Sequence, residues 1–286
     1  MKPELIADYE CEIGENPLWH PTEKKIYWSD IPKGKLFRYD PATEKHEQCY
    51  EGPEVGGFTI QEDGSLLFFM AKGAVATWKN GKLNYIIKEI PEERETRFND
   101  VITDPSGRVF CGMVATSNKP GRLYRLDTNG SIRIVLENIG IPNGIGFTPD
   151  RKYMYYTDTE ALKIYIFDYD QSTGEITNQR VFVETPEGKG FPDGMTVDAE
   201  GYVWSARWDG WSLYRYAPDG TQERQIQFPV KKVSSVIFGG NSYKDIYVTT
   251  AIYDSNKEQD GANAGALFRL RLGIQGVPEF ASKICL

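Results

Sequence analysis

Short runs of alternating hydrophobic and polar residues, rich in aromatic side chains, recur along the whole chain. Examples are KIYWSD, LLFFM, RVFCGM, YMYYTD, YVWSAR and DIYVTT. Turn sequences such as EDG, DPSG, TPDRK and APDG separate these runs, and apolar residues show no sustained helical period. Alternation of this kind over about four to eight residues is typical of half-buried strands, so we predict an all-β protein.

The strand pattern repeats six times. Each repeat has a short strand, a turn, a very apolar strand, a variable loop and an aromatic-basic strand such as KLFRYD. The first strands align as ENPLWHP, GGFTIQEDG, NDVITDPSG, NGIGFTPDR, DGMTVDAEG and SSVIFGGNS, with spacings of 41, 43, 44, 50 and 41 residues. A period of about 40–45 residues with four strands per repeat is typical of a propeller blade. We therefore predict that residues 1–286 form a single domain, a six-bladed β-propeller with four-stranded blades.

The ends of the chain are predicted to close the ring. The segment ELIADYECEI precedes the first repeat and alternates like a strand. We expect it to complete the last blade beside the C-terminal segment, which would leave no long exposed sheet edge.

The leading residues of the six repeats are expected to form a ring around the central channel, because equivalent positions of a propeller surround its axis. These residues are Glu15, Gly56, Asn99, Asn143, Asp193 and Ser234. Turn chemistry is an alternative explanation, since Asn, Asp, Gly and Ser often precede strands. It does not explain Glu15, nor two carboxylates directed at one narrow channel, which repel each other unless a cation binds between them.

The oxygen donors of this ring predict one divalent cation, held by Glu15, Asn143 and Asp193. Such donors suit Ca²⁺, Mg²⁺ or Mn²⁺, and a carboxylate-rich site also accepts Zn²⁺. Three protein ligands leave coordination positions open, as in a catalytic site. Asn99 lies in the same ring and Arg97 two residues earlier, in RFND, so both are predicted to contact a molecule bound at the metal.

The composition excludes several classes of active site and of binding partner. Only two histidines are present, which excludes a three-His zinc site and leaves little for a Ser-His-Asp triad. The net charge of −8 speaks against a nucleic-acid partner or an anionic membrane surface. Four scattered cysteines, no apolar stretch long enough to cross a bilayer and no secretory signal predict a cytoplasmic protein.

Two further motifs allow more than one interpretation. The stretch DYDQSTGEI, from Asp168, resembles a calcium loop, but its glycine is one place late and a hairpin turn is favoured. Trp204, Trp208 and Trp211 are candidates either for the wall of a sugar-binding pocket or for packing between blades.

Four motifs together resemble the regucalcin (senescence marker protein)/gluconolactonase/luciferin-regenerating-enzyme-like lactonase family. They are GENPLW with Glu15, RFNDVITDPSGR with Arg97 and Asn99, IPNGIGFTPD with Asn143, and FPDGMTVDAEGYVW with Asp193. The resemblance covers nearly the whole chain. It implies a six-bladed propeller, one divalent cation on Glu15, Asn143 and Asp193, substrate contacts from Arg97 and Asn99, and Asp193 as the acid/base residue.

The function expected from this resemblance is metal-dependent opening of sugar (aldono-)lactones, as in a gluconolactonase. The alternatives are a phosphotriesterase on the same fold and a calcium-binding regulatory protein without turnover. Two departures from the family pattern stand out. Asn16 replaces a usual glycine, and the loop after Met113, VATSNKPGRLYRL, lacks the acidic substrate contact that the family often places there. The natural lactone, the native metal and the oligomeric state stay open at this point.

Overall fold

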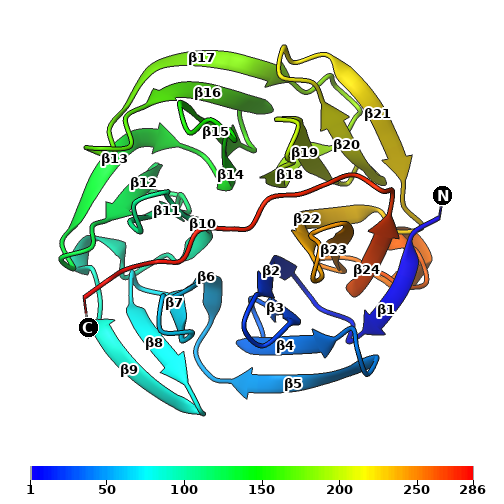
Figure 1. Cartoon of the computed structure of the whole chain (residues 1–286), viewed down its shortest axis with the longest axis horizontal. Helices are drawn as coiled ribbons and strands as arrows, with labels where there is room; N and C mark the ends of the chain where they lie inside the picture. Colours follow the sequence, from blue (N-terminus) through cyan, green and yellow to red (C-terminus); the bar gives the residue numbers. More distant parts are fainter. Residues whose placement is uncertain (1, 286) are drawn as a thin grey trace.

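The computed structural model describes residues 2–285 and arranges them as six four-stranded antiparallel sheets around one axis (Figure 1). In five of the sheets four consecutive strands pair in chain order from the axis outward, and in the sixth β22, β23 and β24 are followed by the N-terminal strand β1. The prediction of an all-β, six-bladed propeller with four-stranded blades is confirmed.

The strands form four concentric layers. The innermost strands are β2 (Gly14–His20), β6 (Val55–Ile60), β10 (Phe98–Thr103), β14 (Pro142–Phe147), β18 (Phe191–Val197) and β22 (Lys232–Gly239). The second layer contains β3 (Lys25–Asp30), β7 (Leu66–Met70), β11 (Val109–Met113), β15 (Tyr153–Asp158), β19 (Val203–Trp208) and β23 (Asp245–Ala251). The third layer contains β4 (Lys35–Asp40), β8 (Val75–Lys79), β12 (Gly121–Leu126), β16 (Lys163–Tyr169), β20 (Ser212–Tyr216) and β24 (Ala266–Arg271).

The outermost layer contains β5 (Lys45–Glu51), β9 (Lys82–Ile87), β13 (Ile132–Ile139), β17 (Ile176–Glu184), β21 (Gln222–Gln227) and β1 (Glu4–Asp8). Two short helices, the 3₁₀ turn η1 (Pro91–Glu93) and α1 (Lys257–Asp260), lie in the connecting loops of the described chain.

The N-terminal strand closes the ring as the sequence predicts. Strand β1 pairs antiparallel with β24 and forms the outer edge of the last blade, with Glu4 opposite Arg269. The Arg269 guanidinium reinforces this edge, because its Nη2 lies 2.9 Å from Glu4 Oε1. The first and the last repeat are therefore joined by hydrogen bonds of one sheet.

The core is divided among the interfaces between neighbouring blades. Six clusters of buried side chains occur in the described chain, and each combines residues of two adjacent blades. Trp204 of β19, for example, packs edge-on against Phe238 of β22, with ring centroids 5.9 Å apart. Large aromatic side chains of this kind supply most of the apolar area that holds the blades together.

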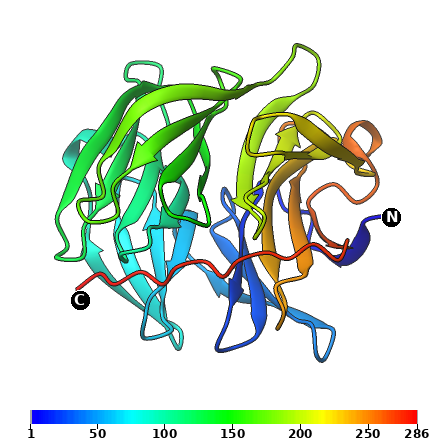
Figure 2. The ribbon, with the colours of Figure 1, turned by 45° about the horizontal axis from the view of Figure 1, so that its top comes forward.

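The C-terminal segment 274–285 takes a course that the sequence did not predict. It crosses one face of the propeller, over the central channel (Figures 1 and 2). Gly276 forms an antiparallel bridge with Asp198, and Ser282 forms a parallel bridge with Gln61. Gln61 also donates from Nε2 to the Ile284 carbonyl, at 3.0 Å. The segment thus links blades on opposite sides of the axis and covers one end of the channel.

The DYDQSTGEI stretch is a hairpin turn, as favoured from the sequence. It joins the paired strands β16 and β17, and Asp170 Oδ1 accepts a hydrogen bond from Ser172 N at 2.8 Å within the turn. Its carboxylate therefore stabilises the local backbone.

The structure also bears on the state of the cysteines and on membrane-spanning helices. Cys11, Cys49, Cys111 and Cys285 are all free thiols; Cys11 and Cys111 are buried in the core, and Cys285 is exposed. Among residues 2–285, none of the helices has the length and apolar character that crossing a membrane requires.

Candidate active site

The leading residues of the six repeats occupy equivalent places in the structure. In every blade the pairing of the innermost strand with its neighbour shifts register at this point, for example between Glu15 and Leu18 or between Asn143 and Ile145. A bulge of this kind bends the strand and re-aims its side chains. The bulge is the backbone feature that all six blades share at the channel.

Close approach of neighbouring blades explains the glycines at and after these positions. A Cβ atom at Gly56 would lie 2.5 Å from the carbonyl carbon of Phe98, and one at Gly144 would lie 2.6 Å from Met195 N. Any side chain there would push neighbouring innermost strands apart. Gly56 therefore belongs to the packing of the channel wall, and the chemistry of the ring rests on its other members.

One cavity of about 470 Å³ brings together all five predicted site residues. They are Glu15, Arg97, Asn99, Asn143 and Asp193. The cavity lies at the end of the channel where the innermost strands begin, since it also includes Ile13 and Ile141, which precede β2 and β14. The remaining lining residues are Thr159, Glu160, Phe191, Trp208 and Tyr253.

A chain of hydrogen bonds connects the polar side chains of this cavity. Arg97 Nη1 donates to Asn99 Oδ1 at 2.6 Å, and Asn99 Nδ2 donates to Asn143 Oδ1 at 2.8 Å. Asn143 Nδ2 in turn donates to Thr159 Oγ1, and Thr159 Oγ1 donates to the Pro192 carbonyl, both at 2.8 Å. The three side chains from the loop before β10, from β10 and from β14 are therefore held in one fixed arrangement.

Thr159 sets the orientation of the Asn143 amide. Its hydroxyl has one proton, which goes to the Pro192 carbonyl, so it must accept from the Asn143 amide nitrogen. The amide oxygen is then the atom turned toward Asn99, and a carbonyl oxygen keeps a second lone pair for another partner. The sequence analysis did not single out this threonine.

The two carboxylates of the ring belong to buried residues, since Glu15 and Asp193 are each only 4% exposed. Burial raises the pKa of Glu15 well above its ordinary value, and repulsion from Asp193 and Asp100 adds to the shift. Burial likewise raises the pKa of Asp193, with Asp100 as the next cause. One hydrogen bond opposes the shift at Glu15, from Asn16 N to Oε2 at 2.9 Å. The Arg97 guanidinium lowers both pKa values, but its effect is smaller than the effects of burial and repulsion.

The donor set fits a divalent cation. A cation among these groups would offset both the desolvation and the mutual repulsion that raise the two pKa values. Within residues 2–285, no group of three or more His, Cys, Asp or Glu side chains gathers in a metal-binding arrangement. The ring instead offers two carboxylates and one oriented amide oxygen, a set of hard oxygen donors.

Arg207 is a charged residue of this region that the sequence analysis missed. It lies on β19 with 1% exposure, and its Nη2 donates to the Tyr216 hydroxyl at 2.7 Å. The guanidinium stacks over the Tyr214 ring, with its Cζ atom 4.9 Å from the centroid. Its charge lowers the pKa of Asp193 and so favours the ionised form of that carboxylate.

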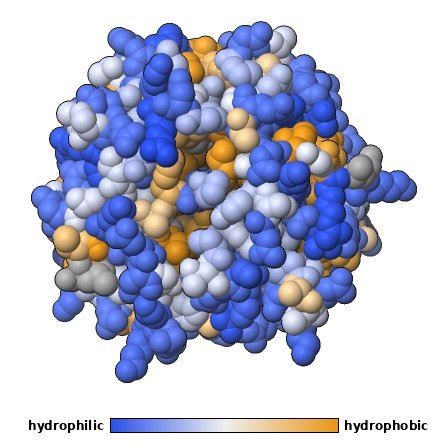
Figure 3. Space-filling model, viewed as in Figure 1, coloured by the Kyte–Doolittle hydropathy of each residue, from blue (hydrophilic) through white to orange (hydrophobic). Residues whose placement is uncertain are grey.

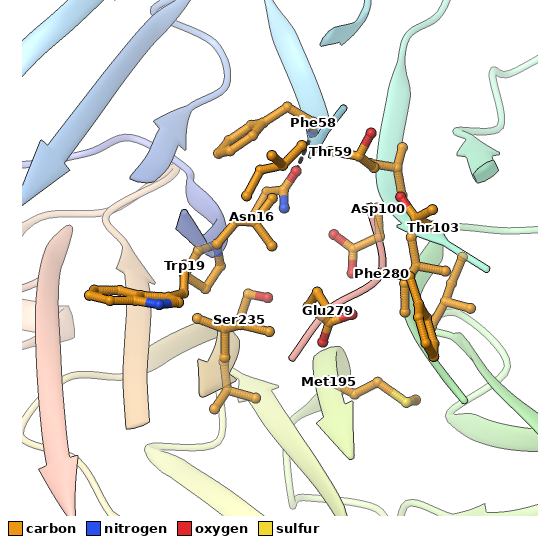
Figure 4. Close-up of a pocket in the computed structure, with 18 of the residues that line it drawn as sticks. Asn16, Trp19, Phe58, Thr59, Asp100, Thr103, Met195, Ser235, Glu279 and Phe280 are labelled. Carbon is orange, nitrogen blue, oxygen red and sulfur yellow. Dashed lines mark hydrogen bonds between the residues drawn. The ribbon is translucent and has the colours of Figure 1, made fainter. Parts of the chain in front are cut away.

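A second, smaller cavity of about 80 Å³ lies further along the channel, beneath the C-terminal segment (Figure 4). Asn16 and Asp100 line it, and each directly follows a residue of the large cavity. Figure 4 shows Asp100 and Glu279 pointing into this space, with Phe280 beside them. Apolar side chains gather near the middle of the same face, inside a mostly hydrophilic rim (Figure 3). Burial raises the pKa of Asp100 and that of Glu279 to about 7.

Glu279→Gln is expected to stabilise the protein above about pH 7 and to have little effect near pH 4. The folded-state pKa of about 7 exceeds the ordinary value of 4.5. The folded protein therefore binds more protons than the unfolded chain between these values, and the free energy of unfolding falls as the pH rises through this window. Glutamine has no proton to lose in this window, so the variant keeps the free energy of unfolding that the wild type loses, which we expect to be about 1–3 kcal/mol. Thermal unfolding of the wild type and of Glu279→Gln at pH 4, 6 and 8 measures the difference in stability. A difference that does not change with pH would contradict the prediction.

Asn16 adopts a backbone conformation that explains the glycine usual in the family pattern. Its φ is 49°, in the left-handed region that glycine enters most easily and that Asn tolerates better than most residues. Its side-chain Oδ1 also accepts a hydrogen bond from Phe58 N of the next blade (Figure 4). The departure at this position therefore preserves the turn and adds a contact between blades.

The three tryptophans have different places. Trp208 lines the large cavity and Trp204 is fully buried between blades, with its Nε1 donating to Asp198 Oδ2 at 2.9 Å. Trp211 lies in the turn after β19, where its φ is 55°. Of the three, Trp208 is the one found in the wall of this cavity.

A six-bladed propeller with a ring of oxygen donors at one end of its channel defines the architecture of this protein. The chain belongs to the family described as "SMP-30/Gluconolactonase/LRE-like region", which matches residues 13–252.

Named relatives and solved structures agree with this membership. The chain is 47% identical to Pentonolactonase XacC of Haloferax volcanii, over 98% of each chain. It is 29% identical to human Regucalcin, again over 98% of each chain. The solved structure of a luciferin-regenerating enzyme has a TM-score of 0.90 at 27% identity and covers 99% of this chain and 100% of that one.

Proposed function

We propose that this protein is a lactonase that hydrolyses sugar lactones of the aldonic acid type, with its active site in the large axial cavity. The observation that carries the proposal is the meeting of Glu15, Arg97, Asn99, Asn143 and Asp193 in that one cavity. The relative at 47% identity, a pentonolactonase, supports a lactone of a five-carbon sugar acid as a substrate to test.

A divalent cation is part of the proposal. Glu15, Asn143 and Asp193 would hold it through their side-chain oxygens. When bound, it would polarise the lactone carbonyl and stabilise negative charge on the carbonyl oxygen, an effect worth several kcal/mol.

Asp193 is proposed as the general base and acid. It belongs to the ring, it is buried, and Arg207 favours its ionised form. Its carboxylate would take a proton from the attacking water and return a proton to the ring oxygen of the lactone as the ester bond breaks. Ring opening then gives the free sugar acid, with no group transferred to the protein.

Arg97 and Asn99 are proposed to hold the substrate. Arg97 has further donor positions beyond those that bind the Phe98 carbonyl and Asn99 Oδ1. Its guanidinium is therefore available to the carbonyl or hydroxyl groups of a bound lactone. Fixing these groups relative to Asp193 reduces the entropy that the reaction step must lose.

The walls of the cavity suit the less polar parts of such a molecule. Phe191, Trp208 and Tyr253 line the cavity, and Phe191 and Tyr253 expose 43% and 45% of their surface. A sugar lactone has C–H groups on its ring faces, which pack against aromatic surfaces, while its hydroxyls point outward. Apolar walls over a charged floor also reduce the water around the reacting ester.

A panel of substrates tests the proposed function. The purified protein would be stripped of metal, reconstituted with single divalent cations, and assayed with five- and six-carbon aldonolactones and with a phosphotriester. The proposal predicts hydrolysis of lactones and little turnover of the phosphotriester. Preferred hydrolysis of the phosphotriester, or metal binding without any turnover, would favour the two alternative functions.

Arg97→Ala is expected to retain the metal and to lower kcat/KM by about tenfold to hundredfold, mainly through a higher KM. Arg97 is not among the proposed metal ligands, so the metal should stay bound. Loss of one charge-assisted hydrogen bond to the substrate corresponds to a change in kcat/KM of about this size. Steady-state kinetics together with metal content per chain measures both effects. Loss of metal with an unchanged KM would contradict the substrate-binding role.

A further inference from the structure

Glu160 is the acidic side chain at the outer wall of the large cavity, away from its buried ring. It follows Thr159 in the turn between β15 and β16 and is exposed. The turn is anchored, because Thr159 N donates to the Ile141 carbonyl at 3.1 Å and Thr159 Oγ1 donates to the Pro192 carbonyl at 2.8 Å. The backbone that carries Glu160 is thus fixed relative to Asn143 and Asp193.

The side chain of Glu160 lies over Gly140, on the loop that leads into β14. A Cβ atom at Gly140 would be 2.6 Å from both Cβ and Cδ of Glu160, so only a glycine leaves room for this placement. The Gly140 carbonyl accepts a hydrogen bond from Ala115 N at 3.1 Å. Glu160 therefore lies next to the loop after β11, which contains no Asp or Glu from Val114 to Gly121.

The Glu160 carboxylate has no hydrogen bond or ion pair to any side chain of residues 2–285. The neighbouring acids differ, since Glu184 of the same blade lies 4.0 Å from Lys163 Nζ, and Asp158 Oδ1 accepts from Ala161 N. Glu160 thus presents unpaired acceptor oxygens to a cavity whose other polar wall groups, Arg97 and Asn99, are already hydrogen-bonded to one another.

We propose that Glu160 is a specificity-determining residue, whose carboxylate accepts hydrogen bonds from the hydroxyl groups of a polyhydroxylated lactone. This inference rests on the proposed lactonase function. The two carboxylate oxygens suit a pair of neighbouring hydroxyls, which a sugar lactone has and a simple lactone lacks. Glu160 takes no part in proton transfer, and its effect is confined to the choice and affinity of the substrate.

Kinetics of Glu160→Ala and Glu160→Gln on two lactones tests the proposal. One substrate is a pentono-1,4-lactone and the other is γ-butyrolactone, which has the same ring without hydroxyls. For Glu160→Ala we expect kcat/KM on the pentonolactone to fall by about 10- to 100-fold, chiefly through KM. On γ-butyrolactone we expect a change of less than about twofold. The kcat/KM of Glu160→Gln on the pentonolactone should lie between those of the wild type and of Glu160→Ala, because the amide keeps one acceptor oxygen. Glu184→Gln, in the outer strand of the same blade, is the matched control and should behave as wild type.

Binding of a pentitol provides a second readout that does not depend on turnover. A pentitol has the hydroxyls but no ester, so calorimetry on metal-reconstituted protein measures hydroxyl recognition alone. We expect Glu160→Ala to bind it about tenfold more weakly than wild type and Glu184→Gln to bind it equally well.

The outcomes separate this inference from the proposed function. Equal losses on both lactones, or unchanged kinetics and pentitol affinity in Glu160→Ala, would overturn the role of Glu160. A wild-type protein that hydrolyses neither lactone would contradict the proposed function. In that case, weaker pentitol binding by Glu160→Ala would still support the role of Glu160 in hydroxyl recognition. Equal pentitol binding by Glu160→Ala and wild type would overturn that role.

Discussion

Asp193→Asn is expected to lower lactone hydrolysis by about 100-fold or more while the propeller stays folded. Asn is nearly isosteric with Asp and keeps one oxygen for a cation, but it cannot accept a proton, and loss of a general base typically has an effect of this size. Asp193 is buried and lines the same cavity as Arg97 and Asn99, the proposed substrate contacts. The measurement is kcat under metal saturation, with thermal unfolding followed in parallel.

A turn role for Asp193 makes the opposite prediction. If this residue only prepares the backbone for its strand, Asn serves equally well and turnover in the metal-saturated variant stays near normal. Asp219→Asn is a suitable control, since Asp219 does act in a turn, where its Oδ1 accepts from Thr221 N at 2.9 Å. That variant should hydrolyse lactones like the wild type.

Removal of divalent metal is expected to abolish turnover, and addition of a divalent cation is expected to restore it. Glu15→Gln should weaken cation binding by at least about tenfold, because one of two buried charges is lost from an oxygen-only site. Calorimetric titration of the metal-free protein measures the affinity, and elemental analysis measures the metal content. Full activity in excess chelator, with no metal in the protein, would refute the metal-dependent mechanism.

The fold was predictable because the same strand pattern recurs in six repeats along the sequence. Six apolar strands at a spacing of 41–50 residues identify the blades, and an alternating segment before Glu15 identifies the strand that closes the ring. The course of residues 274–285 was not predictable. This segment has no strand pattern, and it is held by single bridges and side-chain hydrogen bonds, such as the one from Gln61 to the Ile284 carbonyl.

The residues of the ring were also predictable, because equivalent repeat positions must surround the axis and five of six leading side chains contain oxygen. In the structure Glu15, Asn99, Asn143 and Asp193 line one cavity, together with Arg97. Their chemical roles stay predictions. The outer walls, with Thr159, Glu160 and Tyr253, come from loops that vary between repeats, and such loops have no repeat pattern that places them in space.

The most direct test of metal-dependent lactone hydrolysis is a titration of metal-free protein with a divalent cation during hydrolysis of a pentono-1,4-lactone, with the reaction followed by acid release at constant pH. We expect the rate to rise with added cation and to reach its plateau at one cation per chain, with the rate of Asp193→Asn about 100-fold lower at the same plateau. Acid release at the uncatalysed rate throughout, or a full rate before any cation is added, would contradict it.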